Sequence, residues 1–331
     1  MIFDFALEPE LVASWHDRRV AYPFLSQIGP GQRRVACAFP SASWRNLVMD
    51  AVRAKFPEPM YSESQTARRN VDALLRHLHE TGTRRNGRIG EGESWLIAAI
   101  REHGYFPFGG IVVRTSATRE PYLVVADRVG EEDFPAWTPP APPVARRPGD
   151  LANALAPILR CAAQLRFVDP HFDAGVDAFL EPMRAYLLAA QNRRSVGELQ
   201  IQIHFAVSRE DVGQLARIRS QRVTEDEAAT IRLDACERRL KPILRPGVTL
   251  LVFAWGEGPR GQKMHNRYVL TEVGGIAVQH GLDRSAAPET DDLTVLSKEQ
   301  YEERWAEYSA AGAPYRPIRN CSFAGDPAVA T

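Results

Sequence analysis

The 331-residue sequence has no long apolar run, few cysteines and no excess of either charge, and each shortage excludes a class of protein. No apolar run approaches a membrane-spanning length, and the N-terminus lacks the basic-then-apolar order of a signal peptide. The four cysteines, Cys37, Cys161, Cys236 and Cys321, lie far apart, so neither a zinc site nor a disulfide framework is predicted. We therefore expect a cytoplasmic protein with reduced thiols, no metal and no other cofactor.

The 41 basic and 41 acidic residues cancel, which excludes binding of nucleic acid through overall charge. A local basic patch remains compatible with this balance, and arginines gather once in the first half of the chain. This cluster comprises Arg68, Arg69, Arg76, Arg84, Arg85 and Arg88. It predicts either a contact with nucleic acid or an acidic partner, or an ordinary solvated face.

Two domains are the expectation for this length, because one hydrophobic core rarely serves so many residues. Residues 134–149 carry six prolines, which lack an N–H donor and fix φ, so this segment is predicted to be a linker. Residues 1–133 then form an N-terminal mixed α+β domain, with helices over 43–55, 64–81 and 93–102 and strands over 35–39, 110–114 and 122–126. Residues 150–331 form a second domain.

The second domain alternates more regularly between the two kinds of element. Helices are predicted over 150–164, 176–191 and 210–244, and strands over 165–168, 199–207 and 248–255. Strands that alternate with helices require crossover connections, so we predict an α/β domain with a mainly parallel sheet. A hairpin over residues 264–282 completes that sheet.

The hairpin carries the most informative residues of the chain. Gly274-Gly275 predicts a two-residue turn, because glycine adopts positive φ without strain. A loop of even length places His280 on the same face as His265 and Arg267, whereas an odd loop or a bulge sends His280 to the other face.

The hairpin resembles a known family. His265-x-Arg267-x4-Glu272 has the spacing of the His-x-Lys-x4-Asp motif of the phospholipase D-like superfamily, with arginine for lysine and glutamate for aspartate. After six further residues, where that superfamily has Gly-Ser-x-Asn, this chain has Gln279-His280-Gly281-Leu282. The pattern is most similar to the branch called the MIT C-terminal domain. The resemblance covers the C-terminal half of the chain and implies a phospholipase D-like α/β domain there.

The resemblance also implies a mechanism that uses no metal. One histidine attacks phosphorus to form a phosphohistidine, and a second histidine protonates the leaving oxygen. Carried over by position, His265 is the nucleophile, Arg267 neutralises the phosphate oxygens and Glu272 is the motif acid. Such enzymes use two copies of the motif and this chain has one, so either a homodimer supplies the second copy or His280 acts as the acid.

Four further residues are predicted to bind substrate. Lys263 and Asp283 flank the motif, whereas Asp169 and His171 follow a strand that looks like the first strand of such a domain. Ligands gather beyond strand ends in open α/β sheets. A metal site over residues 169–173 is an alternative, but we favour the interpretation that Asp173 helps to start the next helix.

Three hypotheses follow. The first is a protein that engages a phosphodiester, in nucleic acid rather than lipid, and acts as a nuclease; stand-alone bacterial domains of this kind suggest phage defence and a defence complex as the setting. The second is a non-catalytic scaffold or sensor of the same fold, which binds a partner, nucleic acid or membrane phosphate. In the third, the fold is an unrelated α/β domain, His265 is a satisfied strand residue, and Arg267 packs against Glu272 or Asp283.

Overall fold

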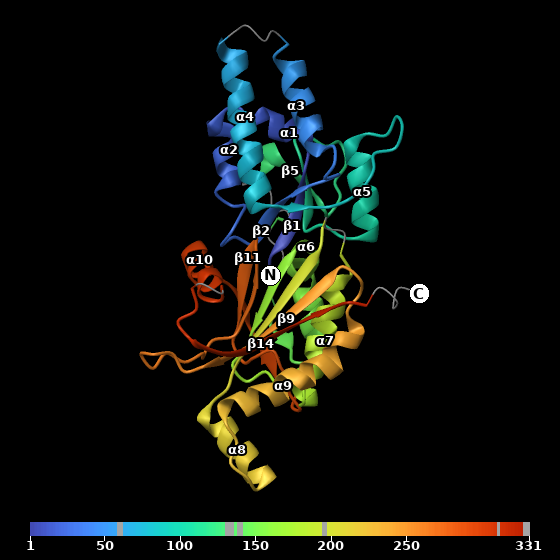
Figure 1. Ribbon diagram of the computed structural model, residues 1–331. Coiled ribbons are helices and arrows are strands. Elements are labelled where there is room, and N and C mark those ends of the chain that lie inside the picture. The colour runs from blue at the N-terminus through green and yellow to red at the C-terminus, as the bar shows by residue number, and fades with distance from the viewer. Residues whose placement is uncertain (58–61, 130–135, 138–141, 194–196, 310–311, 327–331) are drawn as a thin grey trace. The chain divides into compact units, whose positions relative to one another are not determined.

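The computed structural model describes residues 1–57, 62–129, 136–137, 142–193, 197–309 and 312–326, and it divides the chain into two units (Figure 1). The N-terminal unit comprises Ile2–Ala141, and the C-terminal unit comprises Pro142–Arg193 and Gly197–Thr331. Both units combine helices with a sheet, in agreement with the predicted α/β class.

The N-terminal unit contains a five-stranded sheet with the order β3-β2-β1-β4-β5. Its strands are β1 (Phe3–Leu7), β2 (Arg34–Ala38), β3 (Thr83–Arg84), β4 (Gly110–Val113) and β5 (Leu123–Val125). All neighbouring pairs in this sheet are parallel. The unit is therefore an α/β unit built on a parallel sheet, and the prediction of a mixed α+β domain was wrong in this respect.

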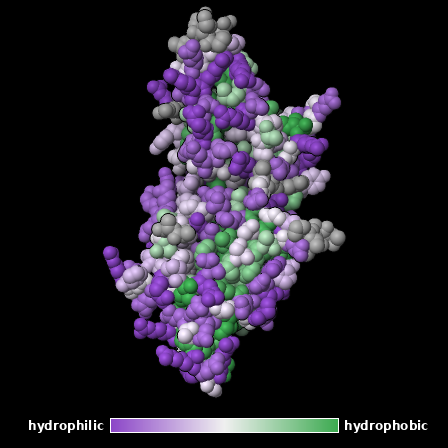
Figure 2. Space-filling view, in the orientation of Figure 1, coloured by the Kyte–Doolittle hydropathy of each residue, from purple (hydrophilic) through white to green (hydrophobic). Residues whose placement is uncertain are grey.

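Helices cover both faces of this parallel sheet, as such sheets require. The helices are α1 (Pro9–Ser14), α2 (Arg18–Leu25), α3 (Trp44–Lys55), α4 (Ser62–Thr81) and α5 (Trp95–Tyr105). The first four contribute to a core with Phe5 and Leu7, whereas α5 packs with Ala6 on the opposite face. Figure 2 shows mainly hydrophilic residues on the visible side of α3 and α4, as expected for solvated helix faces.

The central strand β1 contains a charged residue that is almost fully buried. The Asp4 carboxylate is held by Arg85, whose Nε and Nη2 each lie 2.7 Å from one of its oxygens. Arg85 also donates to the carbonyl of Phe106 at 2.6 Å, and its guanidinium lies 4.0 Å from the ring centroid of Phe108. Arg85 is therefore a core residue, and its prediction as a surface contact was wrong.

The boundary between the two units, at Ala141–Pro142, lies within the predicted linker over residues 134–149, of which residues 134–135 lie outside the described residues. Trp137 is buried in the N-terminal core. Residues 138–141 lie outside the described residues. Val144–Ala145 then forms strand β6, which pairs with β12 (Thr290–Asp291), and helix α6 (Pro148–Cys161) begins with Pro148 in its first turn, where a missing N–H costs nothing.

The C-terminal unit is built around a seven-stranded sheet with the order β13-β11-β10-β7-β8-β9-β14. Its strands are β7 (Gln164–Val168), β8 (Leu199–Ala206), β9 (Val248–Gly256), β10 (Tyr268–Thr271), β11 (Gly274–Val278), β13 (Leu293–Val295) and β14 (Arg316–Ala324). Within the described residues, β8 runs parallel to β7 and to β9, and the other neighbouring pairs are antiparallel. The expectation of a mainly parallel sheet was wrong, because helices separate only β7, β8 and β9.

The helices of this unit are α7 (Asp177–Gln191), α8 (Arg209–Arg219), α9 (Glu225–Leu240) and α10 (Lys298–Glu307), in addition to α6. The single long helix predicted over 210–244 is divided into α8 and α9. Ser220 ends α8 with φ 52°, in the left-handed region. Thr224 and Glu227 then form a capping box that starts α9, so the Ser/Thr-x-x-Glu signal was present in the sequence and was overlooked.

We predict that Arg85→Ala lowers the free energy of unfolding by roughly 3–5 kcal/mol, because Asp4 would remain buried without its partner. Chemical denaturation followed by circular dichroism measures this loss. Arg84→Ala, at the exposed neighbouring position, serves as the control and should change stability by no more than about 0.5 kcal/mol. Equal effects of the two substitutions would contradict a structural role for the Asp4–Arg85 pair.

Candidate functional site

A cavity of about 660 Å³ opens at the carboxyl ends of β7, β8 and β9. Its walls come from the segments that follow these strands and from the segment that precedes β10. The lining residues include Pro170, His171, Ser208, Arg209, Asp211, Trp255, Glu257, Lys263, His265 and Arg267. This is the edge of an open α/β sheet where ligand crevices form.

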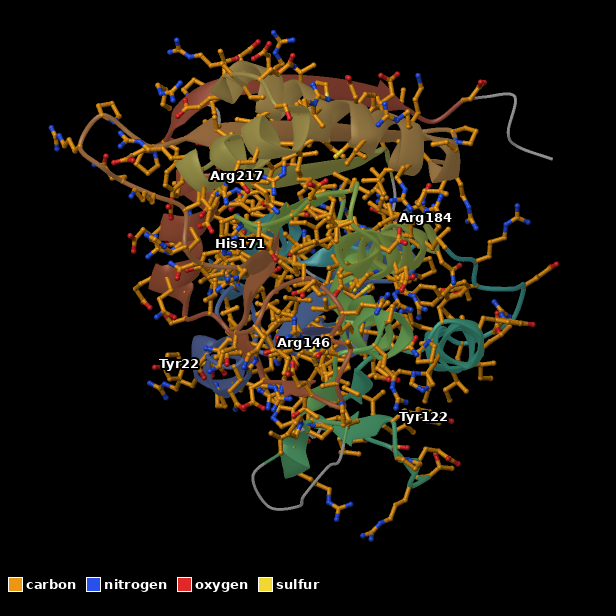
Figure 3. All side chains as sticks on the ribbon, turned by 90° about the horizontal axis from the view of Figure 1, so that it is seen from below. Tyr22, Tyr122, Arg146, His171, Arg184 and Arg217 are labelled. Atoms are coloured by element: carbon orange, nitrogen blue, oxygen red, sulfur yellow. The ribbon has the colours of Figure 1, made fainter. Side chains whose placement is uncertain are left out.

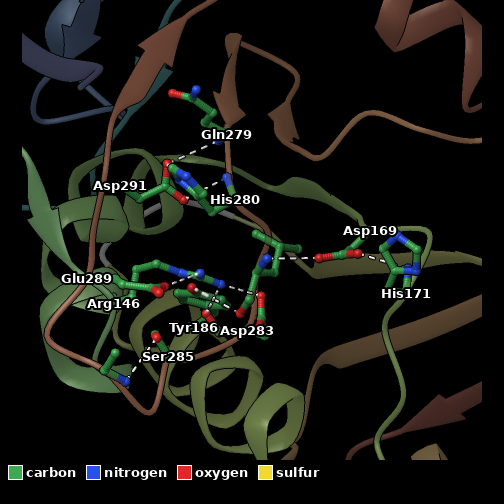
Figure 4. Close-up of polar contacts among 12 residues, drawn as sticks. Arg146, Asp169, His171, Tyr186, Gln279, His280, Asp283, Ser285, Glu289 and Asp291 are labelled. Carbon is green, nitrogen blue, oxygen red and sulfur yellow. Dashed lines mark hydrogen bonds and ion pairs between the residues drawn. The ribbon is translucent and has the colours of Figure 1, made fainter.

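Asp169 lies directly after β7 and anchors the loops at this edge. Its side chain is almost fully buried and accepts hydrogen bonds from the backbone N–H of His171 at 2.9 Å and of Leu282 at 2.8 Å. Burial raises the pKa of the Asp169 carboxyl, although these two donors and the positive charge of Arg267 oppose the rise. Asp169 therefore joins the loop after β7 to the loop after β11 (Figure 4).

Arg267 is held beside this carboxylate at the wall of the cavity. Its Nε is buried and has no hydrogen-bond partner among the described residues. Gly281 lies against both groups: a Cβ atom built there would be 3.2 Å from Asp169 Oδ2, 3.9 Å from Arg267 Nε and 2.7 Å from Asp283 Oδ1. With its φ of +121°, this position requires glycine on two counts.

Four basic side chains in the cavity wall remain exposed, namely His171, Arg209, Lys263 and His265. The Lys263 ammonium lies 3.7 Å from Glu257, which is an exposed and weakly held pair. His265 precedes β10, which begins at Tyr268, so the expectation that His265 belongs to the hairpin strand was wrong. Two imidazoles nevertheless line one cavity, and they come from segments on opposite sides of β8 and β9 in the sequence.

Arg232 of α9 fixes the two strand ends that frame this cavity. Its guanidinium donates to the carbonyl of Ala206 at 2.7 Å and to that of His171 at 3.1 Å. It also lies 3.6 Å from Asp173 and 3.7 Å from Asp211, and it is almost fully buried. Nothing in the sequence around Arg232 distinguishes it from the other arginines of a charged helix, so its role could not be predicted from the sequence.

The hairpin turn lies two residues earlier than predicted. Thr271 pairs with Gly274, so Glu272 and Val273 form the turn, and the two glycines belong to β11. Packing favours glycine at position 275, because a Cβ atom there would lie 2.7 Å from Leu270 Cδ2 and 2.9 Å from Leu296 Cδ1, so these side chains would have to shift. The glycine pair was interpreted as a turn signal although it meets a packing need.

Glu272 lies away from the cavity, in contrast to the prediction of a catalytic role. Its carboxylate accepts hydrogen bonds from the backbone N–H of Ala163 at 2.6 Å and of Gln164 at 2.9 Å, at the start of β7. Five residues of extended chain separate it from Arg267, which corresponds to roughly 16 Å. Glu272 ties the hairpin turn to the amino end of β7.

His280 and Asp283, both predicted to serve the site, are engaged elsewhere. His280 Nδ1 lies 3.4 Å from Asp291, which also accepts the backbone N–H of His280, and Figure 4 shows this pair apart from His171. Asp283 accepts from Arg146 at 2.6 Å. The hairpin loop has two residues, an even number, which is the case in which His280 was expected on the face of His265. However, β11 ends at Val278, so strand alternation does not determine the direction of the His280 side chain.

The predicted basic cluster of the N-terminal unit does not form one patch. Arg85 is buried, Arg68 donates to the carbonyl of Phe56 at 3.0 Å, and Arg76 pairs with Asp72. The remaining exposed members are Arg69, Arg84 and Arg88, which lie on α4, on β3 and after β3. The interpretation as a solvated face agrees better with this spread than a nucleic-acid contact does.

The residues that could hold a metal at this edge have other partners. Asp173 accepts the backbone N–H of Gly175 at 2.7 Å, in the turn before α7, which agrees with the favoured interpretation. Among the described residues, no three histidine, cysteine or acidic side chains converge as a metal site would require. Within the same residues, no helix combines the length and the apolar character needed to cross a membrane.

Beneath the cavity, His204 of β8 is fully buried and uncharged. Its Nδ1 accepts from Trp255 Nε1 at 3.1 Å, its Nε2 lies 3.1 Å from Gln202 Oε1, and its ring stacks on Phe253 at 4.8 Å. Burial, and secondarily the charge of Arg166, lower its pKa to about 3. His204 positions Trp255, which lines the cavity, and does not exchange protons near neutral pH.

Comparison with known proteins yields little. No protein-family model and no curated protein sequence matches this chain. Among solved structures, the chain is similar to that of TrmBL2, an archaeal chromatin protein with a novel mode of DNA binding, at 10% identity and a TM-score of 0.23. That match covers 80% of this chain and 81% of the other. A TM-score of this size does not establish a common fold.

We predict that Glu272→Ala lowers the free energy of unfolding by roughly 1–3 kcal/mol, because two backbone N–H groups lose their acceptor. Urea denaturation measures the effect, with the exposed Glu302→Ala of α10 as the control. An unchanged stability in Glu272→Ala would show that the carboxylate does not tether the turn.

Because the pKa of His204 falls from 6.5 to about 3 on folding, only the unfolded chain takes up a proton there between these pH values. The contribution to stability is complete above pH 6.5 and is lost as the pH falls toward 3, by about 1.4 kcal/mol per pH unit. His204→Asn, which keeps an acceptor for Trp255, should show a pH slope smaller by one proton in denaturation series. An identical slope in both proteins would refute this assignment.

Proposed function

We propose that the C-terminal unit binds a phosphodiester in the cavity at the ends of β7, β8 and β9 and hydrolyses it without a metal. One observation carries the proposal: His171, His265, Lys263 and Arg267 line the same cavity. Two imidazoles can serve as nucleophile and acid, and a guanidinium and an ammonium match the charge of a phosphate group. The resemblance of His265-x-Arg267 to the phospholipase D-like motif supports the same chemistry.

In the proposed reaction, an imidazole nitrogen of His265 attacks phosphorus and forms a phosphohistidine, while His171 gives its proton to the leaving oxygen. Water then attacks the phosphohistidine, His171 takes a proton from that water, and His265 departs as the free imidazole. Arg267 stabilises the additional negative charge on the phosphate oxygens, and Asp169 keeps Arg267 in place. His171 thus fills the role that the sequence analysis gave to His280 or to a second copy of the chain.

The second candidate is a module of the same fold that binds a phosphate group without turnover. Two positions favour it: where the superfamily has serine and asparagine, this chain has His280, which faces Asp291, and Leu282, which is buried. Neither contributes a polar side chain to the cavity. Binding needs only the cations of the wall, whereas hydrolysis also needs the two imidazoles to act together.

We predict that the protein cleaves bis(4-nitrophenyl) phosphate and oligonucleotides in EDTA, and that His265→Ala abolishes cleavage because the nucleophile is lost. His171→Ala should slow oligonucleotide cleavage by roughly 10²- to 10⁴-fold, the usual contribution of a general acid, and cleavage of bis(4-nitrophenyl) phosphate much less, because nitrophenolate leaves without a proton. Release of nitrophenolate and gel assays measure these effects. His280→Ala is the matched control, because its imidazole is exposed but engaged by Asp291.

Three outcomes decide between the candidates. Cleavage that survives His265→Ala, or that depends on added divalent metal, contradicts the proposed mechanism. Oligonucleotide binding that Arg267→Gln weakens, without cleavage by any variant, establishes the binding module. Full activity in His280→Ala together with loss in His171→Ala places the acid on the loop after β7.

A further inference from the structure

Helix α8 begins at the rim of the cavity and is the least buried helix of the C-terminal unit. Its N-terminal cap residue, Ser208, and its first-turn residues Arg209 and Asp211 line the cavity. None of its residues is buried. Figure 1 shows α8 projecting at the lower end of this unit, beyond α9. Its 11 residues extend roughly 16 Å from the cavity rim.

The far half of this helix and the turn that follows it carry positive charge alone. From Val212 to Thr224 there is no acidic residue, whereas Arg217, Arg219 and Arg222 are all exposed. Arg217 donates only to the carbonyl of Gly213, one helical turn earlier. None of the three guanidinium groups forms an ion pair with a described carboxylate.

The acidic residues that follow are already engaged. Glu225 pairs with Arg316, Asp226 accepts from Arg319 at 2.9 Å, and Glu227 closes the capping box with Thr224. Arg217, Arg219 and Arg222 of the α8 arm, defined here as residues 209–222, therefore have no ion-pair partner among the described residues (Figure 3 labels Arg217). The arm also contains Glu210 and Asp211 next to the cavity, and hydrogen bonds from Thr224, and secondarily the charge of Arg219, lower the pKa of Glu227.

The composition of this arm favours a polyanionic chain over a bilayer surface. A helix that lies on a membrane presents a broad apolar face of aromatic and leucine side chains. On α8 only Ile218 is a strongly exposed large apolar residue, and Val212 and Leu215 are half-buried. An arginine without an ion-pair partner can form bidentate hydrogen bonds with a phosphate, so a row of such arginines matches the regularly spaced phosphates of a nucleic acid.

We propose that the α8 arm binds the sugar-phosphate backbone of a nucleic acid whose reacting or bound phosphodiester occupies the cavity. This inference rests on the proposed function and specifies its substrate class as a polynucleotide. The arm extends the phosphate-binding surface from Arg209 and Arg267 to Arg222. At about 3.4 Å per phosphate of one B-form strand, its length spans about five phosphates.

The test is binding of a fluorescent single-stranded oligonucleotide and of its duplex, by anisotropy, across a series of salt concentrations, with His265→Ala added to every protein so that the oligonucleotide is not cleaved during the measurement. The variant combines Arg217→Gln, Arg219→Gln and Arg222→Gln, because glutamine preserves helix propensity. The control combines Arg147→Gln, Arg184→Gln and Arg238→Gln, which removes the same charge from exposed positions of the same unit. Circular dichroism confirms that both are folded.

We expect the α8 variant to bind roughly 10- to 100-fold more weakly and to reduce the salt slope for the single strand by about 2, since three phosphate contacts are lost. The control variant should bind like the wild-type protein. Unchanged binding in the α8 variant, equal losses in both variants, or no binding of either oligonucleotide by the wild-type protein would overturn the proposal. If the α8 variant binds both oligonucleotides normally but loses binding to phosphatidylserine vesicles, the proposal is overturned and the arm is a membrane-binding surface.

Failure of this inference is distinguishable from failure of the proposed function. If the α8 variant cleaves bis(4-nitrophenyl) phosphate normally but loses oligonucleotide binding, the arm and the cavity function both stand. If His265→Ala and Arg267→Gln change nothing while the α8 variant still loses binding, the arm stands and the cavity function fails.

Discussion

A buried carboxylate that must find partners inside the protein controls the shape of the candidate site. Asp169 cannot be hydrated, so its charge has to be met by the N–H groups of His171 and Leu282 and by the nearby Arg267. Those partners belong to loops that are more than a hundred residues apart in the chain. Satisfying one anion therefore brings both halves of the cavity wall together.

The site combines such buried, fixed groups with exposed groups that are free to react. Arg232 and Asp169 are almost fully buried and hold backbone atoms, whereas His171 and His265 are exposed in the cavity wall. The proposed chemistry on a phosphate requires such a division, because imidazoles that react need access to substrate and solvent while their supports need rigidity. Charge alone therefore does not distinguish the residues that hold the site in place from the residues that are accessible to a ligand.

Much of the second unit follows from local pattern, because β7, β8 and β9 are rich in apolar residues, helices separate them, and their carboxyl ends meet at one edge. What the pattern could not supply depends on partners distant in sequence. Strand β1 was missed because Asp4 interrupts its apolar run, and only Arg85, far along the chain, makes that charge tolerable in a core. The predicted position of His280 assumed strand alternation, but β11 ends at Val278, and His280 lies beside Asp291 outside that strand.

The glycine at position 275 has an implication for how this domain can vary. Its missing side chain leaves room for Leu270 and Leu296, so the constraint comes from the helix α10 side of the sheet and not from the reversal of the chain. The turn at 272–273 carries constraints of its own, because Glu272 accepts two backbone N–H groups at the start of β7 and Val273 is buried. Alignments of homologous sequences can therefore be anchored on both the layer of aliphatic residues that the glycine admits and the acidic residue of the turn.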